Sequence, residues 1–389
     1  MPDSEENKPT PQYFTCLPYI NLGDIPEVDL GFAKIWNFDL SKEKYIPDQA
    51  LREHIEIIMK NYKQSYPYGE REEPYLPIKG IGFINIGIPS GHRPSKSENE
   101  KINDARLLIF ISFLARNNTL TRNANTGHRM ATSENYAPLY FSAVVGSKYM
   151  TENVGFAVPS WHGGILIDKN TFISPKYIPR PNFSIDEDLL KSLIELRSKH
   201  KRFFRRIVSA VEVFYESYYN APEVSHNARI LLQASAFEIL FNTESGKIRE
   251  KIKLFFRKVA DYPEDKRLTF ESERGGKIVK ETGTIREKWA DSFFTLRNHI
   301  IHGEIPKERE YFFGKWQRHF DIALYFFIFC LKRKIEEGLD KELFGDEVVW
   351  KNWIDKLSIP VKRYIGFEYD GFGRRYWERM RPKLPTGKP

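Results

Sequence analysis

Three polar side chains lie close together near residue 300, in the segment WADSFFTLRNHIIHGE from Trp289 to Glu304. Asn298 and His302 are four residues apart and therefore share one face of a helix, and Arg297 is long enough to reach the same space. An imidazole can move the proton of a ribose 2'-hydroxyl or of a leaving oxygen, and a guanidinium stabilises the charge that builds on phosphate. These residue types suit cleavage of a phosphodiester, a chemistry that requires no metal ion.

The same spacing also has a structural explanation. His302 falls in a last helical turn, where unpaired carbonyls favour an imidazolium, so a capping histidine beside a salt-bridged arginine gives the same pattern. Glu238 is open to two interpretations as well. It falls on a face of small and apolar residues, where a carboxylate is costly unless it is paired, so it forms either a structural ion pair with an arginine or part of a catalytic site.

Helical periodicity dominates the chain after residue 184. Ser184 is the expected N-cap of the first helix, and 268–284 reads as a small hairpin or a loop. The helix that carries Arg297 ends at Gly303, with Pro306 beyond it, a usual C-terminal stop. The pattern predicts an all-α bundle of about five helices, over residues 186–219, 224–241, 248–259, 285–302 and 315–338.

The helix 285–302 has two apolar strips in its sequence. Phe294 and Ile301 form one of them, and Arg297 lies between this strip and the other. The other strip is expected to face the bundle core and consists of Trp289, Phe293, Leu296 and Ile300. Since one bundle does not easily cover both strips, we infer a homodimer through the helix 285–302, with a second copy on the Phe294 strip.

The segment LRNHIIHGE resembles the signature of the HEPN superfamily, in which an arginine is followed after four to six residues by a histidine, with asparagine favoured directly after the arginine. It is similar to the form seen in the Apea-like HEPN branch. Upstream, QASAFEILF (Gln233 to Phe241) resembles the helix of that branch with a small-residue-then-glutamate pattern, which makes Glu238 the acidic position. The resemblance covers roughly residues 186–338.

The resemblance implies a helical bundle that dimerises so that two motifs share a cleft, and in many members a metal-independent endoribonuclease. By position, Arg297 holds the scissile phosphate, His302 acts as general base or acid, Asn298 orients the pair, and Glu238 contacts Arg297 or His302. Attack by the 2'-hydroxyl leaves a 2',3'-cyclic phosphate. The implied partner is RNA, with tRNA as one candidate, and the implied role is an anti-phage or abortive-infection effector with a phage-derived trigger. The alternative is a non-catalytic HEPN module that dimerises and binds RNA, a nucleotide or a protein.

The charge of the chain is one-sided. Its net charge is +8, but residues 1–175 carry −2 and the remainder carries +10. Such a balance suggests a polyanionic partner, and the helix 248–259 contributes a dense set of cations. Six further cations lie within ten positions and are RNA-binding candidates, with a solvated helix face as the competing explanation: Arg197, Lys199, Lys201, Arg202, Arg205 and Arg206.

The front half indicates a different architecture. Strand-like segments at 78–88, 137–145 and 154–168 accompany helix-like segments at 49–62 and 102–114, and a proline-rich linker follows at 175–182. The sequence therefore predicts an α+β N-terminal domain (1–178), sensing or regulatory by analogy only, followed by an all-α HEPN-type helical bundle (179–389) that includes an unassigned aromatic and basic tail from residue 346.

Several classes of protein are excluded. No apolar run approaches the roughly 20 residues of a membrane helix, and no secretory signal is legible, so a cytoplasmic protein is expected. The two cysteines, Cys16 and Cys330, are too far apart in the chain for a metal-binding pair. No cofactor motif is complete, because the glycines around Gly80 and Gly82 do not fit a dinucleotide fingerprint and read instead as a closely packed strand. Neither a metal nor a cofactor is predicted.

Overall fold

The fold is described from a computed structural model of the chain. It describes residues 11–17, 20, 22, 25, 27–39, 63–65, 75–77, 80–87, 94–117, 139–144, 156–160, 163–167, 176–177, 185–218, 224–243, 247–258, 268–274, 277–313 and 317–344. The tail from residue 346, the expected helix at 49–62 and the division at residue 178 lie outside these ranges.

The N-terminal half contains a five-stranded antiparallel sheet. Its strand order is β2-β3-β6-β1-β7, with β1 (Pro11–Leu17), β2 (Glu27–Asp29), β3 (Lys34–Asp39), β6 (Gly80–Asn85) and β7 (Leu139–Val144). Strands β6 and β7 confirm two of the strand predictions. At Gly82 in β6, a Cβ atom would lie 3.3 Å from the carbonyl oxygen of Ile20, so the close packing expected for this glycine-rich segment is observed.

Shorter strands complete the front half. Strands β8 (Phe156–Ser160) and β9 (Gly163–Ile167) form an antiparallel hairpin within the predicted 154–168 segment. Strands β4 (Lys63–Ser65) and β5 (Tyr75–Pro77) pair with each other, and β10 (Lys176–Tyr177) pairs in parallel with β4. Part of the expected proline-rich linker is therefore a strand, because pairing with β4 satisfies its backbone groups.

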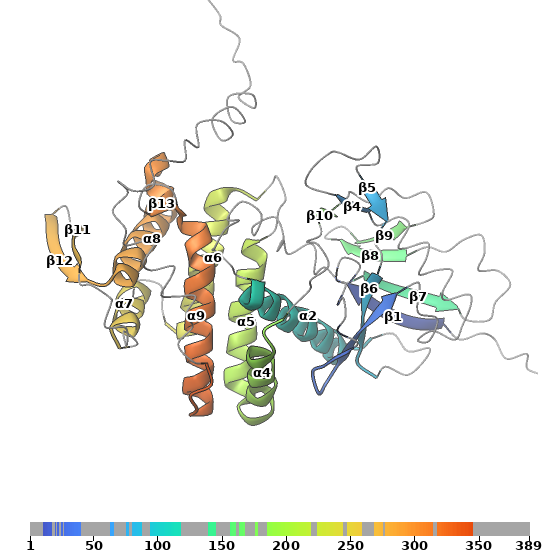
Figure 1. The fold of residues 1–389 in the computed structure, drawn as a ribbon. Helices are drawn as coiled ribbons and strands as arrows, with labels where there is room; N and C mark the ends of the chain where they lie inside the picture. The colour runs from blue at the N-terminus through green and yellow to red at the C-terminus, as the bar shows by residue number, and fades with distance from the viewer. Residues whose placement is uncertain are drawn as a thin grey trace, which may run out of the picture.

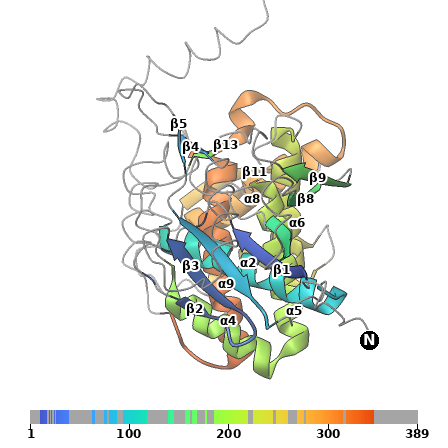
Figure 2. The ribbon, with the colours of Figure 1, turned by 90° about the vertical axis from the view of Figure 1, so that its right-hand side faces the viewer.

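Helix α2 (Lys96–Asn117) joins the two halves of the molecule. It contains the predicted apolar segment, and its buried side chains pack against the helices that follow; the Phe110 ring contacts the Tyr215 ring edge-on at 5.0 Å. Figure 1 shows α2 between the sheet and the helical bundle, and Figure 2 shows the sheet strands in front of it. The N-terminal half is thus packed directly on the bundle.

The predicted helix 186–219 is wrong as a single element. The chain forms α4 (Glu187–Lys199) and α5 (Lys201–Ser217), with His200 in a non-helical conformation between them. Leu196 and Phe203, on either side of the break, both lie against Gly338 near the end of α9 (His319–Leu339). The break lets both apolar faces pack on the same helix, so tertiary packing overrides a periodicity that continues through residue 200.

The helix ends show further differences. The observed cap of α4 is Asp186, whose Oδ1 accepts a hydrogen bond from the Leu189 amide at 2.9 Å, and not the expected Ser184. Helix α9 begins at His319 and not at residue 315, because Gln317–Arg318 form strand β14, which pairs with β13 (Phe312–Phe313). Helices α6 (His226–Phe241) and α7 (Ile248–Lys258) agree with the prediction over their described residues.

The bundle is mainly but not entirely helical. Between α7 and α8 (Ile285–Ile301), strands β11 (Leu268–Arg274) and β12 (Lys277–Gly283) form the hairpin that the sequence left open. The core contains many aromatic rings: Phe214 stacks on Phe327 at 4.0 Å, and Trp289 contacts Phe326 at 4.4 Å with the two rings tilted. Among the described helices, none is long and apolar enough to cross a membrane.

Candidate functional site

Helix α8 carries Arg297, Asn298 and His302, and both of its ends are well defined. Its N-cap Thr284 and Glu287 form a capping box, in which Thr284 Oγ1 accepts from the Glu287 amide and the Glu287 carboxylate accepts from the Thr284 amide. This arrangement satisfies two amide donors that a helix start leaves unpaired. At the other end His302 is the C-cap, and Gly303 follows with a φ of +74°. The helix therefore stops where the sequence predicted.

Arg297 forms an ion pair with Glu238 on α6. Its Nη2 lies 2.7 Å from Glu238 Oε1, and its Nη1 donates to Asn298 Oδ1 at 3.1 Å. The two charged side chains are only 12% and 15% exposed. Of the two contacts expected for Glu238, the structure shows the one with Arg297. Together these contacts hold the guanidinium in one orientation at the crossing of α6 and α8.

The environment of Glu238 opposes its charge. Burial raises the pKa of the Glu238 carboxyl, and the Arg297 guanidinium offsets part of that shift. The Glu238 carboxylate lies on a face of α6 that is otherwise small and apolar, and its charge is stabilised there by Arg297.

His302 lies apart from this pair. Its backbone N–H donates to the Asn298 carbonyl at 3.0 Å, but its exposed imidazole makes no hydrogen bond or ion pair with any residue in the described part of the chain. The structure thus brings Glu238, Arg297 and Asn298 together and leaves the His302 ring open to solvent at the next turn.

A second histidine of the motif has acidic neighbours. His299 Nε2 lies 3.8 Å from Glu304 Oε2, and His299 Nδ1 lies 3.8 Å from Glu310 Oε2. The two carboxylates come from the loop after α8 and from the 3₁₀ helix η4 (Glu308–Tyr311). Sequence reasoning missed this group, although three glutamates within nine residues of the motif were a visible signal. The two carboxylates flank opposite ring nitrogens, and no cluster of three or more metal-ligating side chains occurs among the described residues.

The expected second apolar strip of α8 is wrong in part. Phe294 is 1% exposed, and its ring contacts the Phe237 ring edge-on at 6.3 Å, because α6 and α7 pack along α8 and rings of α9 contact it as well. Trp289, Phe293 and Leu296 are buried, as predicted for the core strip. Of the second strip only Ile301 is exposed, at 49%, and Ile305 beyond the helix end is 94% exposed. Phe294 is therefore not available to a second copy of the chain and no longer supports the inferred dimer.

The six candidate RNA-binding cations at the α4–α5 junction are largely engaged in the fold. Arg205 Nη1 lies 2.8 Å from Asp104 Oδ1, and Arg197 Nε lies 4.0 Å from Asp104 Oδ2. The Arg197 guanidinium also stacks on Phe32 at 3.9 Å. These contacts join α2 and the sheet to the bundle, so the two arginines have a structural role that the sequence did not reveal.

The other four cations of that set differ in exposure. Arg206 is half-buried and lies over the Phe203 ring at 4.5 Å. Lys199, Lys201 and Arg202 are exposed, and Lys199 pairs with Glu195 at 2.6 Å. All six lie near the C-terminal end of α9, where Leu196 and Phe203 contact Gly338. Helix α9 is about 30 Å long, so they are far from its N-terminal end. Figure 1 shows α4 beside the lower end of α9 and β13, which follows η4, beside its upper end. The structure does not bring this set to the motif.

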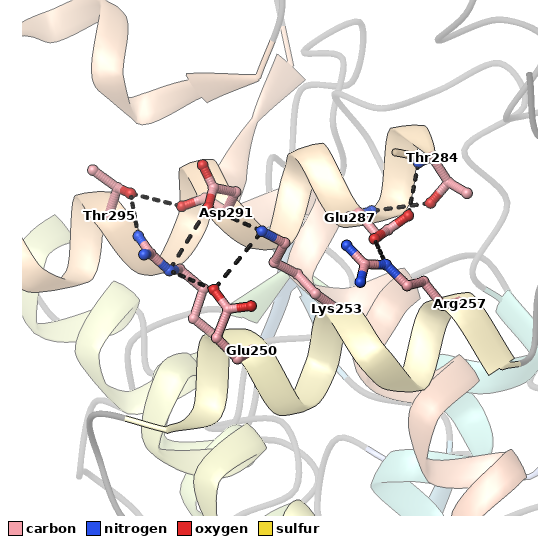
Figure 3. Close-up of polar contacts among 8 residues, drawn as sticks. Glu250, Lys253, Arg257, Thr284, Glu287, Asp291 and Thr295 are labelled. Atoms are coloured by element: carbon pink, nitrogen blue, oxygen red, sulfur yellow. Dashed lines mark hydrogen bonds and ion pairs between the residues drawn. The ribbon is translucent and has the colours of Figure 1, made fainter. Parts of the chain in front are cut away.

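Three cations of α7 also have a structural role. As Figure 3 shows, side chains of α7 and α8 form a ladder of polar contacts along the two helices. Arg257 pairs with Glu287, and Lys253 Nζ lies 3.7 Å from Asp291 Oδ1. Arg249 lies 3.7 Å from Asp291 and 3.5 Å from Thr295 Oγ1. Lys253 is 2% exposed and Arg257 is 55% exposed, so the ladder runs from the interior to the surface and fixes α8 ahead of Arg297.

The chain was compared with known proteins. No protein-family model matches it, and neither curated proteins nor solved structures give a significant match. The interpretation of the site therefore depends on its residues and geometry.

Proposed function

We propose that this chain is a metal-independent endoribonuclease of HEPN type. The observation that carries the proposal is the Arg297–Glu238 pair at 2.7 Å, with the exposed imidazole of His302, which pairs with none of the described residues, about one turn further along α8. A guanidinium held by a carboxylate has its remaining N–H groups in a fixed direction, which suits a phosphate. An exposed imidazole is the usual side chain for proton transfer near neutral pH.

The proposed reaction needs only these groups and the RNA. The 2'-hydroxyl attacks the neighbouring phosphorus, His302 accepts the hydroxyl proton, and the bond from phosphorus to the 5'-oxygen breaks. Arg297 stabilises the charge on the phosphate during this step, and Asn298 and Glu238 hold Arg297 in place. The products are a 2',3'-cyclic phosphate and a 5'-hydroxyl, so DNA, which has no 2'-hydroxyl, is not cut.

The leaving 5'-oxygen must take up a proton, and one imidazole in the single chain does not supply both transfers. A dimer that brings the two α8 ends together supplies the second group as the partner's His302. The exposed Ile301 and Ile305, which flank His302, are the apolar side chains that such an interface covers. An anti-phage role for the enzyme rests on the resemblance of the motif alone.

The experiment is an RNA-cleavage assay on the purified full chain in EDTA, with the product ends mapped. Wild type is expected to release 2',3'-cyclic phosphate ends, and His302→Ala to lose cleavage by about 100-fold or more. His200→Ala is a matched control, because His200 is also exposed but lies at the α4–α5 junction. Cleavage that survives in both His302→Ala and Arg297→Ala would falsify the proposal.

A second candidate is a non-catalytic module that dimerises and binds RNA, a nucleotide or a protein. The burial of Arg297, which is 12% exposed, favours it, since an arginine used only for folding looks the same. The two candidates separate in the same assay, because a binding module retains RNA without forming cyclic phosphate ends.

A further inference from the structure

A small aromatic group lies at the N-terminal end of α6. The ring of His226 lies 5.2 Å from the ring of Tyr311 and 6.0 Å from that of Phe320. The Tyr311 hydroxyl donates to Asn227 Oδ1 at 2.6 Å, which fixes the orientation of the Tyr311 ring. All three rings are half-buried, so each retains some exposure to solvent.

Two guanidiniums accompany these rings. Burial, together with the charges of Arg318 and Arg229, lowers the pKa of His226 to about 4. His226 is therefore neutral at physiological pH and presents an uncharged aromatic ring within a positive field. Arg318 is exposed and also lies over the Phe312 ring at 5.9 Å.

This group is connected to the motif through η4. Tyr311 directly follows Glu310, whose carboxylate lies 3.8 Å from His299, and His299 is one helical turn before His302. Glu304, in the loop after the motif, and Glu308, the first residue of η4, are both exposed and repel phosphate, and the exposed Lys307 and Arg309 beside them offset part of that charge. A bound strand is therefore favoured on the α6 side, where the two arginines lie, and disfavoured on the loop.

We propose that His226, Arg229, Tyr311 and Arg318 form a binding surface for an unpaired nucleotide of single-stranded RNA, here named the α6 platform. The inference rests on the proposed function and extends it by placing the substrate strand beside the cleavage site. One base stacks on the rings, and the guanidiniums contact the phosphates on either side of it. Double-stranded nucleic acid is a poor ligand, since its bases are already stacked.

The test measures fluorescence anisotropy of a labelled, mixed-sequence 12-nucleotide RNA with the full chain. A His302→Ala background prevents cleavage during the titration. Tyr311→Ala is expected to weaken binding by about tenfold, and Tyr311→Phe, which retains the ring and loses the hydroxyl, by less than about threefold. Arg318→Gln is expected to weaken binding and to reduce the dependence of log K on log salt by about one phosphate contact.

The outcomes are separable. The platform is overturned if Tyr311→Ala binds RNA as tightly as the parent, if Tyr311→Phe loses as much as Tyr311→Ala, or if a duplex of the same sequence binds equally well. If Tyr311→Ala does not fold, the exposed Arg318→Gln decides, and an unchanged affinity and salt slope overturn the platform. If RNA binding depends on Tyr311 but wild type does not cleave RNA, the nuclease proposal is refuted and the α6 platform stands. If wild type cleaves RNA and binding does not depend on Tyr311, the platform is refuted and the nuclease proposal stands.

Discussion

Arg297 and Glu238 are 59 positions apart in the sequence, and their side chains meet at 2.7 Å where α8 crosses α6. Each side chain is mostly buried, at 12% and 15% exposed, so each charge depends on the other. The pair fixes the direction in which the guanidinium can act, whichever of the two candidate functions holds.

The stability of this pair can be measured with a double-mutant cycle. Either Glu238→Leu or Arg297→Met alone leaves a mostly buried charge without its partner, so each is expected to lower the free energy of unfolding by about 2 kcal/mol or more. The double variant removes both charges and is expected to recover much of the loss. Urea unfolding gives the four values.

A control for that cycle is the exposed pair Glu187 and Lys191, four residues apart on α4 at 3.5 Å. Its coupling energy is expected to stay below about 0.5 kcal/mol, because solvent screens both charges. Equal coupling in the two cycles would show that the Glu238–Arg297 pair behaves as a surface pair.

The polar ladder between α7 and α8 makes a second prediction. Lys253→Met keeps most of the length of the side chain but leaves the Asp291 carboxylate with less compensation in the interior, so it is expected to cost about 2 kcal/mol. Lys258→Met, at an exposed position on the same helix, is expected to stay within about 0.5 kcal/mol. The measurement is urea unfolding, with amide exchange of α8 as a local readout. Similar costs at the two lysines contradict a structural role for the ladder.

Buried histidine makes the stability depend on pH. Burial lowers the pKa of His319 from 6.5 to about 3, so the folded chain leaves this ring neutral while the unfolded chain protonates it. The stabilisation is present above pH 6.5 and is lost as the pH falls toward 3. As the pH is lowered from 6 to 5, the free energy of unfolding is therefore expected to fall less in His319→Gln than in wild type. The difference between the two slopes is expected to be up to about 1.4 kcal/mol per pH unit.

This pH dependence is measured by urea unfolding at pH 7, 6 and 5. Gln can retain a hydrogen bond to Ser292, whose Oγ lies 3.0 Å from His319 Nε2, so the comparison concerns the slope with pH and not the absolute stability. The exposed His200→Gln is the control. A slope unchanged by His319→Gln refutes the assignment to His319.

The arginines at the α4–α5 junction are expected to affect packing and not RNA affinity. Arg205→Ala leaves the Asp104 carboxylate, which is 1% exposed, without its 2.8 Å partner. Faster amide exchange in α2 is therefore expected, with RNA affinity in the His302→Ala background unchanged within about twofold. The double variant Lys201→Gln, Arg202→Gln removes two exposed charges at the same junction. If it weakens RNA binding as strongly as Arg318→Gln, the junction takes part in binding after all.

Much of the architecture could be predicted where local signals are strong. The end of α8 at Gly303 and the extents of α6 and α7 follow from helix stops and apolar periodicity that act over a few residues, whereas the alternation at 268–284 left a hairpin and a loop both open. The break at His200 could not be predicted, because the apolar periodicity of the sequence continues through residue 200. The break is favoured only by the packing of both α4 and α5 on α9, which is a tertiary contact. The start of α9 was missed for a similar reason, as the pairing of β13 with β14 competes with helix.

The sequence by itself determined which chemical groups are close along α8 and where that helix ends, because spacing of four residues and a glycine stop are local properties. It also indicated Glu238 as a carboxylate in need of a partner. Only the tertiary structure decided that the partner is Arg297, that Phe294 is interior, and that Arg197 and Arg205 hold α2 to the bundle. These outcomes depend on which helices surround each face, and contacts between residues far apart in the chain leave no periodic trace in it.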